Sequence, residues 1–269
     1  MFSVVIPVGP SRNGRRALGS LEQAGLSEGD QVIVVGDGHR PEVDAFSDRL
    51  PLNITSTPQV SGANNARNLG ASLADQPYLC FLDDDDEYLP NALEALRSMI
   101  DAKPDVAVWS LSWKMASKRS MPRARRKEHL SEPDICRRNV AGGCSSMVIK
   151  STAFRKVGGF DPEMKSMQDW DLWLRLACLF PLQLTAEPYI LYHDHDAPRI
   201  STNPAARLAG LERLLKKNTS HWSASVCAFH RARLAAELFR ADQGSWWSIF
   251  QIRAPIASLC FACKALCLS

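Results

Sequence analysis

Short apolar runs alternate with segments of helical periodicity through the first 110 residues. The runs that are rich in β-branched or other apolar side chains predict strands at 3–8, 31–35, 52–56, 77–82 and 105–113. The segments between them have the spacing of helices at 13–24, 41–49, 61–73 and 90–100. Because strands and helices alternate, the pattern predicts an α/β fold with a mostly parallel sheet and helices on both faces.

The pattern changes after residue 114. Residues 114–138 are basic, interrupted by prolines and weakly periodic, which is typical of an exposed loop or of a contact with an acceptor or an anionic membrane. Ordered elements return as strands near 141–149 and 189–192 and an apolar helix at 167–176. Beyond residue 204 the chain has helical spacing at 205–217, 223–240 and 245–268. We therefore predict an α/β domain over residues 1–203 and a C-terminal helical appendage over residues 204–269.

Four consecutive aspartates, Asp83 to Asp86, follow the apolar run at 77–82 and are themselves followed by Glu87. Adjacent carboxylates repel one another unless a cation lies among them. In an open α/β sheet the carboxyl ends of the strands form the ligand crevice, and hard divalent cations prefer oxygen ligands. The run therefore predicts a metal held by one or two carboxylates with a phosphorylated ligand on its open side. The alternative is a solvated acidic loop that caps the next helix.

Two further charged residues lie where the pattern predicts ligand contacts. Asp37 follows the second strand between two glycines, so it is either near a ligand or an ordinary turn residue. Arg67 shares a helix face with Asn64 and Asn68 in the first two turns, where free N–H groups and the helix dipole favour an anion. Arg67 is therefore a candidate phosphate partner, or it pairs with the aspartate run.

The later helix and strand supply three more candidates. Asp169 lies at the start of an apolar helix beside large aromatic residues, where it is either the N-cap or a functional acid. His193 and His195 follow the last strand among acids, which suits a metal ligand or a solvated loop.

Composition narrows the possible classes of protein. The 269 residues are enough for one large domain, and 45% hydrophobic and 23% charged residues are ordinary for a globular protein. A formal net charge of +3 gives no reason to expect nucleic acid as a partner. The sequence shows no basic leader, no cleavage site and no run of 18 uncharged apolar residues. With eight scattered cysteines, these features favour free thiols in a reducing cytosol.

Seven segments together resemble the inverting family 2 glycosyltransferases, which have the GT-A fold. They occur in the family's order, cover roughly residues 3–218, and read SVVIPVGPSRN, VIVVGDG, ANNARNLGASLA, YLCFLDDDDEYLP, GGCSSMVIKSTAFRKVGGFD, QDWDLWLRL and YHDHDAPRIST. The resemblance implies that Pro7 and Asp37 hold the base of a nucleotide. It also places Arg67 in the family's Ala-Arg-Asn-x-Gly element and matches Asp83, Asp84 and Asp85 to the DXD motif.

The resemblance further assigns roles within these motifs. Asp85 is implied as the direct metal ligand and Asp84 as the ribose partner, with the register uncertain by one residue among the four aspartates. Asp169 is implied as the catalytic base. His195 is implied as the late histidine that reaches the metal, together with Asp83 among the metal residues, and His193 competes for that role.

The implied reaction is an inverting transfer of a sugar from a nucleotide-diphosphate sugar to an acceptor hydroxyl, aided by Mn²⁺ or Mg²⁺. A sugar or lipid-linked acceptor in cell-surface polysaccharide or glycolipid synthesis is the implied setting. Gly36, His39 and Gln168 stand where the family has an aspartate, a serine and an acid. These departures leave the choice of nucleotide open and keep a second hypothesis, a catalytically degenerate nucleotide-sugar-binding or scaffold protein.

The C-terminal tail gives an indication of where in the cell the protein lies. Trp246, Trp247 and Phe250 stand near basic residues, so the tail either lies at a membrane surface or packs on the preceding domain. We therefore expect a cytoplasmic protein whose tail makes a peripheral contact with the inner face of the membrane, or none.

Overall fold

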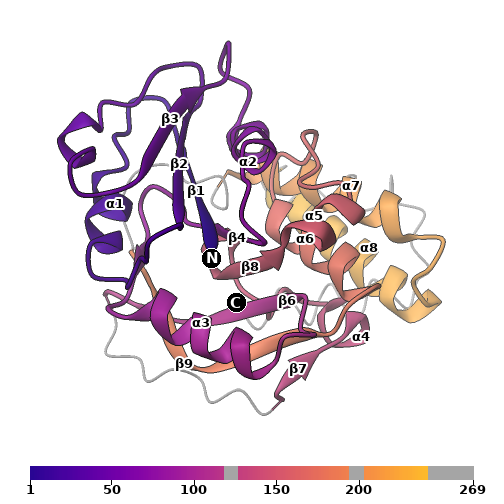
Figure 1. Cartoon of the computed structure of the whole chain (residues 1–269). Coiled ribbons are helices and arrows are strands. Elements are labelled where there is room, and N and C mark those ends of the chain that lie inside the picture. The colour runs from indigo at the N-terminus through magenta and orange to yellow at the C-terminus, as the bar shows by residue number, and fades with distance from the viewer. Residues whose placement is uncertain (118–126, 194–202, 242–269) are drawn as a thin grey trace.

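The computed structural model describes residues 1–117, 127–193 and 203–241, and within them a nine-stranded mixed sheet is flanked by helices (Figure 1). Along the sheet the order is β3-β2-β1-β4-β8-β6-β9-β5, and β7 pairs with β9. The strands are β1 Phe2–Val8, β2 Gln31–Gly36, β3 Leu52–Ser56, β4 Tyr78–Phe81, β5 Glu87–Tyr88, β6 Val108–Met115, β7 His129–Leu130, β8 Met147–Lys150 and β9 Leu182–Tyr192. The helices are α1 Arg15–Leu21, α2 Ala63–Ser72, α3 Ala92–Ala102, α4 Glu132–Ile135, α5 Ser151–Lys156, α6 Gln168–Ala177, α7 Pro204–Asn218 and α8 Ala224–Ala241.

The first four strands of the sheet run parallel, as the alternating pattern predicts. β1 pairs in parallel with both β2 and β4, and β2 pairs in parallel with β3. β8 is antiparallel to both β4 and β6, so β6 and its parallel partner β9 return to the direction of the first four strands. The mostly parallel sheet is confirmed, and the carboxyl ends of its parallel strands face one edge.

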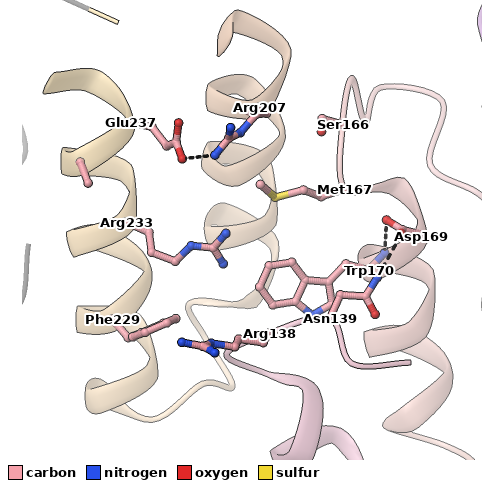
Figure 2. A pocket seen from close by; sticks show the side chains of 11 residues that line it. Arg138, Asn139, Ser166, Met167, Asp169, Trp170, Arg207, Phe229, Arg233 and Glu237 are labelled. Atoms are coloured by element: carbon pink, nitrogen blue, oxygen red, sulfur yellow. Dashed lines mark hydrogen bonds and ion pairs between the residues drawn. The ribbon is translucent and has the colours of Figure 1, made fainter. Parts of the chain in front are cut away.

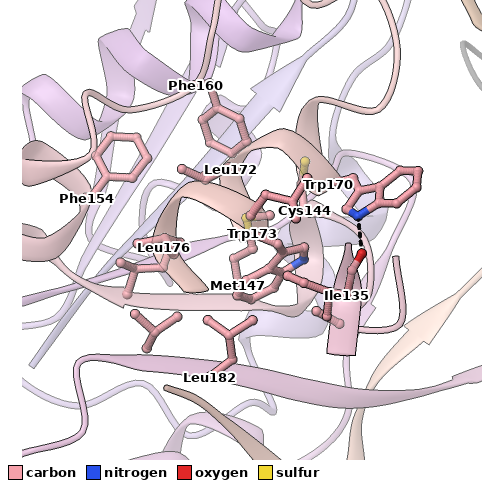
Figure 3. Packing of buried hydrophobic residues seen from close by; sticks show 14 of the residues in the cluster. Ile135, Cys144, Met147, Phe154, Phe160, Trp170, Leu172, Trp173, Leu176 and Leu182 are labelled. Carbon is pink, nitrogen blue, oxygen red and sulfur yellow. Dashed lines mark hydrogen bonds between the residues drawn. The ribbon is translucent and has the colours of Figure 1, made fainter. Parts of the chain in front are cut away.

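Two hydrophobic cores lie on opposite faces of the sheet, because successive side chains of each strand alternate in direction. In β1, Val5 joins one core while Val4 and Ile6 join the other. The first core includes Trp173 of α6, Phe160 and Met147, as Figure 3 shows. Leu214 of α7 and Trp222, in the turn between α7 and α8, are buried in this same core. The division of the chain at residue 203 stays a prediction.

A few predicted elements differ from the structure. The helix predicted at 41–49 is a single 3-10 turn, Asp44–Phe46. The N–H of Phe46 donates to the carbonyl of Val43, and the N–H groups of Arg49 and Leu50 donate to the carbonyl of Phe46, so the segment forms turns and not a continuous helix. β5 is two residues long and gives no periodic signal, and β9 begins well before the predicted strand at 189–192. The tail beyond 241 and part of the basic segment lie outside the described residues. Among the helices of the described part, none combines the length and apolar character needed to cross a membrane.

Candidate active site

Asp37 and the aspartate run lie in loops at the carboxyl ends of β2 and β4, which flank β1 in the sheet. The N–H of Gly9, after β1, donates to Asp84 Oδ2 at 3.0 Å, and the N–H of Asp37, after β2, donates to the carbonyl of Val8 at 2.9 Å. Pro7 is buried within β1, in register with Val35. The structure therefore brings Pro7, Asp37 and the aspartate run to one edge of the sheet, the usual ligand edge of an open α/β fold.

Asp83 forms an ion pair with Arg67 of α2. The distance from Arg67 Nη2 to Asp83 Oδ1 is 2.5 Å, and the arginine side chain is only 4% exposed. Burial by itself lowers the pKa of a guanidinium, but the Asp83 carboxylate more than offsets it and keeps the pKa of Arg67 above its ordinary value. The predicted pairing of Arg67 with the aspartate run is thus confirmed, and a contact with phosphate stays a prediction.

Arg12, in the loop after β1, joins the next two aspartates. Its Nη1 lies 2.6 Å from Asp84 Oδ1 and 2.9 Å from Asp85 Oδ2. Burial raises the pKa of Asp84, while hydrogen bonds from Gly9 and Arg12 act in the opposite direction. The Asp84 side chain is 7% exposed and that of Asp85 is 27% exposed. Asp85 is therefore better placed than Asp84 to reach a ligand from solvent.

Asp86 differs from the other three aspartates because it points into the protein. Its Oδ2 accepts a hydrogen bond of 2.5 Å from Ser145 Oγ, and that hydroxyl oxygen also accepts from the N–H of Asp83 at 3.0 Å. Burial, with the nearby charge of Asp83, raises the pKa of Asp86 to about 8. Because Asp86 is buried against Ser145 while Asp83 and Asp85 keep part of their side chains exposed, the geometry favours Asp83 to Asp85 as the register of the DXD motif.

The donor chemistry of Asp83 and Asp85 fits a hard divalent cation. Both offer carboxylate oxygens and both keep more than a quarter of their side-chain surface exposed. No group of three histidine, cysteine or acidic side chains converges on one point within residues 1–117, 127–193 and 203–241. The described residues would therefore supply one or two carboxylates to such an ion and leave its remaining positions to other ligands. His195, the predicted late ligand, lies outside the described residues, and His193 Nε2 lies 2.6 Å from Glu87 Oε1.

Asp37 is buried and shapes the entry into α2. Its Oδ1 accepts hydrogen bonds from the N–H of Ser61 at 2.7 Å and from Thr57 Oγ1 at 3.3 Å, and its Oδ2 accepts from the N–H of Gly62 at 3.0 Å. These bonds fix the loop that leads to the helix bearing Arg67. Contact between Asp37 and a nucleotide base stays a prediction.

Asp169 stands in the first turn of α6, and the predicted alternative that it is the N-cap is wrong. The N-cap residue is Met167, and Asp169 Oδ1 accepts from the N–H of Trp170 at 2.8 Å. Asn139 Nδ2 donates to Asp169 Oδ2 at 2.9 Å. Burial raises the pKa of Asp169 to about 6, partly opposed by Trp170 and by the charge of Arg67. On the same helix, Arg175 Nη2 lies 2.6 Å from Asp171 Oδ2 and forms an ion pair with it.

A cavity of about 590 Å³ opens beside Asp169 (Figure 2). It lies between the start of α6 and the C-terminal helices α7 and α8. Asp169 interacts electrostatically with Asp83 and Arg67 on one side and lines this cavity on the other. An acid in this position can accept a proton from a group bound in the cavity while it lies near a ligand of the aspartate run.

Sequence reasoning missed several of these residues. Arg12 gave a usable signal, since it follows the carboxyl end of the first strand, where ligand loops gather. Asn139 and Ser145 gave none, because their partners Asp169 and Asp86 are 30 and 59 residues away. The arginines of α7 and α8 that line the cavity were equally hidden, because only tertiary packing brings those helices to α6.

Comparison with known proteins agrees with the fold and with the motifs. The family model described as glycosyl transferase family 2 matches residues 10–158. An uncharacterized glycosyltransferase of Haemophilus influenzae is 26% identical over 186 residues, which cover 65% of this chain and 62% of that protein. The pre-mycofactocin glycosyltransferase of Mycobacterium tuberculosis is 31% identical over 207 residues, which cover 72% of this chain and 42% of that protein. The chain thus spans less than two thirds of the length of these relatives.

A solved structure shares the architecture. The crystal structure of residues 1–349 of S. aureus TarS in complex with UDP-GlcNAc matches with a TM-score of 0.69 at 17% identity, and the match covers 89% of this chain and 72% of that one. At this identity the likeness concerns the fold, which is the GT-A fold that the seven sequence segments predicted.

Proposed function

The chain belongs to glycosyl transferase family 2, and we propose that it transfers a sugar from a nucleotide-diphosphate sugar to a hydroxyl group of an acceptor. The observation that carries this proposal is the position of Asp169, between the Arg67–Asp83 pair and an open cavity. A nucleotide-sugar donor is supported by the S. aureus TarS structure, whose complex contains UDP-GlcNAc. The proposed donor lies at the edge where β1, β2 and β4 end, and the proposed acceptor lies in the cavity.

On the donor side, Asp83 and Asp85 are the residues that would hold Mn²⁺ or Mg²⁺, with a late histidine such as His195 as a further ligand. When bound, such an ion supplies positive charge that stabilises a diphosphate leaving group. Arg12 lies against Asp84 and Asp85, so a donor and its metal would share these carboxylates with a guanidinium already in place. Pro7 and Asp37 remain the proposed neighbours of the base, and Asp84 of the ribose.

On the acceptor side, Asp169 is the proposed general base. It accepts the proton of the acceptor hydroxyl as that oxygen attacks the anomeric carbon from the face opposite the leaving group, which inverts the centre. Asn139 holds one carboxylate oxygen of Asp169 and the N–H of Trp170 holds the other, so the side chain is oriented before the acceptor binds. With a pKa of about 6, Asp169 is mostly deprotonated at pH 7 and is a stronger base than an ordinary aspartate.

The wider role that we propose is the assembly of a cell-surface polysaccharide or glycolipid at the cytoplasmic side of a membrane. The support is the resemblance to family 2 enzymes, and it concerns the family more than this site. The C-terminal tail, if it contacts lipid, would place the acceptor cavity near a lipid-linked acceptor.

The test begins with the donor. UDP-, GDP-, CMP- and dTDP-sugars are screened with and without Mn²⁺ for thermal stabilisation and for release of nucleotide. We expect one nucleotide class to stabilise the protein in a metal-dependent way. Asp169→Asn should keep that stabilisation and lose roughly 10²- to 10⁴-fold in transfer rate. Asp105→Asn, which changes an exposed carboxylate, serves as the control and should behave as wild type.

Three results would count against parts of this proposal. Near-normal transfer by Asp169→Asn would remove Asp169 as the base. Donor binding without turnover at any acceptor would favour the catalytically degenerate binding protein. No stabilisation by any donor would refute the donor site itself.

A further inference from the structure

Three arginines line the cavity beside Asp169. Arg138 comes from the segment after α4, Arg207 from α7 and Arg233 from α8. Figure 2 shows the side chain of Arg233 extending from α8 toward Trp170 at the start of α6, and the side chain of Arg207 extending from α7 toward Glu237. The acidic residues that line the cavity are Asp169 of α6 and Glu237 of α8. The cavity is therefore lined by guanidinium groups on the side away from the aspartate run.

The charges in this cavity are not evenly matched. Arg207 forms an ion pair with Glu237, and the Asp169 carboxylate is held by Asn139 and the N–H of Trp170. Arg233 stacks over the Trp170 ring, with its guanidinium carbon 5.4 Å from the ring centre. The carboxylates thus have partners within the chain, and the guanidinium of Arg233 faces the cavity against an aromatic wall.

The surroundings of Arg233 disfavour its charge. Burial lowers the pKa of Arg233, Glu237 acts against this, and the like charges of Arg207 and Arg138 lower the pKa further. An anion that enters such surroundings stabilises the charged form of the arginine. It compensates the loss of hydration and reduces the repulsion between the guanidinium groups. Arginine forks also bind carboxylate and phosphate oxygens in pairs, which gives the strongest charge-assisted hydrogen bonds.

We propose that the cavity binds an acceptor that carries an oxyanion, a phosphate or a carboxylate, and that Arg233 and Arg138 recognise this group. This inference rests on the proposed function, since it names the acceptor class of that site. The anionic group lies at the α7–α8 side, because Asp169 repels it from the other end. The hydroxyl that receives the sugar then lies toward Asp169. A volume of about 590 Å³ is within the usual range for a small-molecule site.

The test measures binding without any donor, so it is independent of turnover. Glucose 6-phosphate, glucuronate and glucose are titrated calorimetrically into the whole protein. We expect one or both anionic sugars to bind at least tenfold more tightly than glucose. Arg233→Gln or Arg138→Gln should weaken the affinity for the anionic sugar roughly ten- to hundredfold. Arg231→Gln, on the same helix but outside the cavity, and Arg12→Gln, on the donor side, should leave it unchanged. Asp169→Asn should strengthen anion binding, because it removes a negative charge from the cavity wall.

The comparison of glucose 6-phosphate with glucuronate shows whether the acceptor carries a phosphate or a carboxylate. Preference for glucose 6-phosphate points to a phosphorylated acceptor, including a lipid phosphate, and preference for glucuronate points to an acidic sugar. Equal binding of all three sugars, no binding of any, or anion binding that survives Arg233→Gln and Arg138→Gln but fails in Arg12→Gln would each overturn the proposal. Failure of the proposed transferase function appears separately, as absence of nucleotide release from any donor sugar.

Discussion

Asp169→Asn is expected to make the protein more stable at neutral pH even as it removes the proposed base. The folded protein raises the pKa of Asp169 from 3.8 to about 6, because burial disfavours the carboxylate. That difference corresponds to an unfavourable contribution of about 3 kcal/mol at pH 7 and above, since one pKa unit is about 1.4 kcal/mol. An asparagine carries no charge and avoids this contribution.

Part of the gain is offset by hydrogen bonding. The asparagine Oδ1 can still accept from the N–H of Trp170, but its amide group would face the Asn139 amide that now donates to Asp169 Oδ2. Asn139 cannot simply turn over, because its own Oδ1 accepts from the N–H groups of Ala141 and Gly142. One lost hydrogen bond costs about 1 kcal/mol, so the expected net stabilisation is about 1–2 kcal/mol at pH 8.

The sign of the pH dependence follows from linkage. Well below pH 3.8, the ordinary pKa of the carboxyl, Asp169 is protonated in both folded and unfolded protein, so wild type and variant differ only by the hydrogen bond. Between pH 4 and 6 the unfolded carboxyl loses its proton while the folded one keeps it, so the wild type loses stability relative to the variant. Well above pH 6 the folded carboxyl is ionised as well, and the stability difference between variant and wild type no longer changes with pH.

Urea unfolding of both proteins at pH 4, 5, 6 and 8 measures this difference directly. We expect the difference in free energy of unfolding to shift in favour of the variant from pH 4 to 6 and to change little above pH 6. A difference that does not change with pH would refute the burial argument for Asp169. A variant that is less stable at pH 8 would show that the bond from Asn139 outweighs the charge.

Three further outcomes test other parts of the structure. Transfer activity should fall below pH 6, as protonation of Asp169 removes the proposed base, and a rate profile that stays flat from pH 5 to 8 would contradict the role. Arg67→Met should lower the free energy of unfolding by about 1–3 kcal/mol, measured by urea unfolding, because it removes a buried ion pair whose carboxylate is partly exposed. Gly70→Ala should destabilise the protein by about 1–3 kcal/mol, since the added Cβ would lie 2.4 Å from Val5 Cγ1. Gly19→Ala in α1 meets nothing within 4 Å and should stabilise the protein by about 0.5–1 kcal/mol. Equal thermal shifts for the two glycine variants would contradict the packing of α2 on β1.

The meeting of Asp37 and the aspartate run at one edge of the sheet could be predicted because these residues follow strand ends in the sequence. Asp37 and the aspartate run each come directly after an apolar strand, and parallel strands deliver their carboxyl ends to one edge. The spacing of Asn64 and Arg67 likewise predicted a shared helix face, and the structure turns this face toward the segment around Asp161, whose carbonyl accepts from Asn64 at 2.9 Å. In each case a local pattern and one rule of topology were sufficient.

The aspartate run shows what the local sequence pattern could not predict, namely which of its four carboxylates points into the protein. Four identical residues give no reason to single out Asp86, yet it is the one that turns inward to Ser145. The partner lies 59 residues away, in the 3-10 turn before β8, and reaches Asp86 only because β8 pairs with β4. Register within a run of like residues is therefore set by a strand pairing that the sequence does not display.

The cavity that we propose for the acceptor depends on long-range packing in the same way. Its walls come from the segment after α4, from the start of α6 and from two C-terminal helices, so residues up to about a hundred positions apart meet only after the core has formed. The core residue that draws these parts together is Trp222, whose indole stacks on His230 of α8 and donates to Glu132 of α4 at 2.8 Å. Because the first core includes Trp222 and Leu214 together with α6, the helices that carry Arg207 and Arg233 are held against Asp169 by the packing that also stabilises the sheet. Loss of the C-terminal helices should therefore remove the cavity as well as part of the core, while the carboxyl ends of β1, β2 and β4 keep the donor side in place.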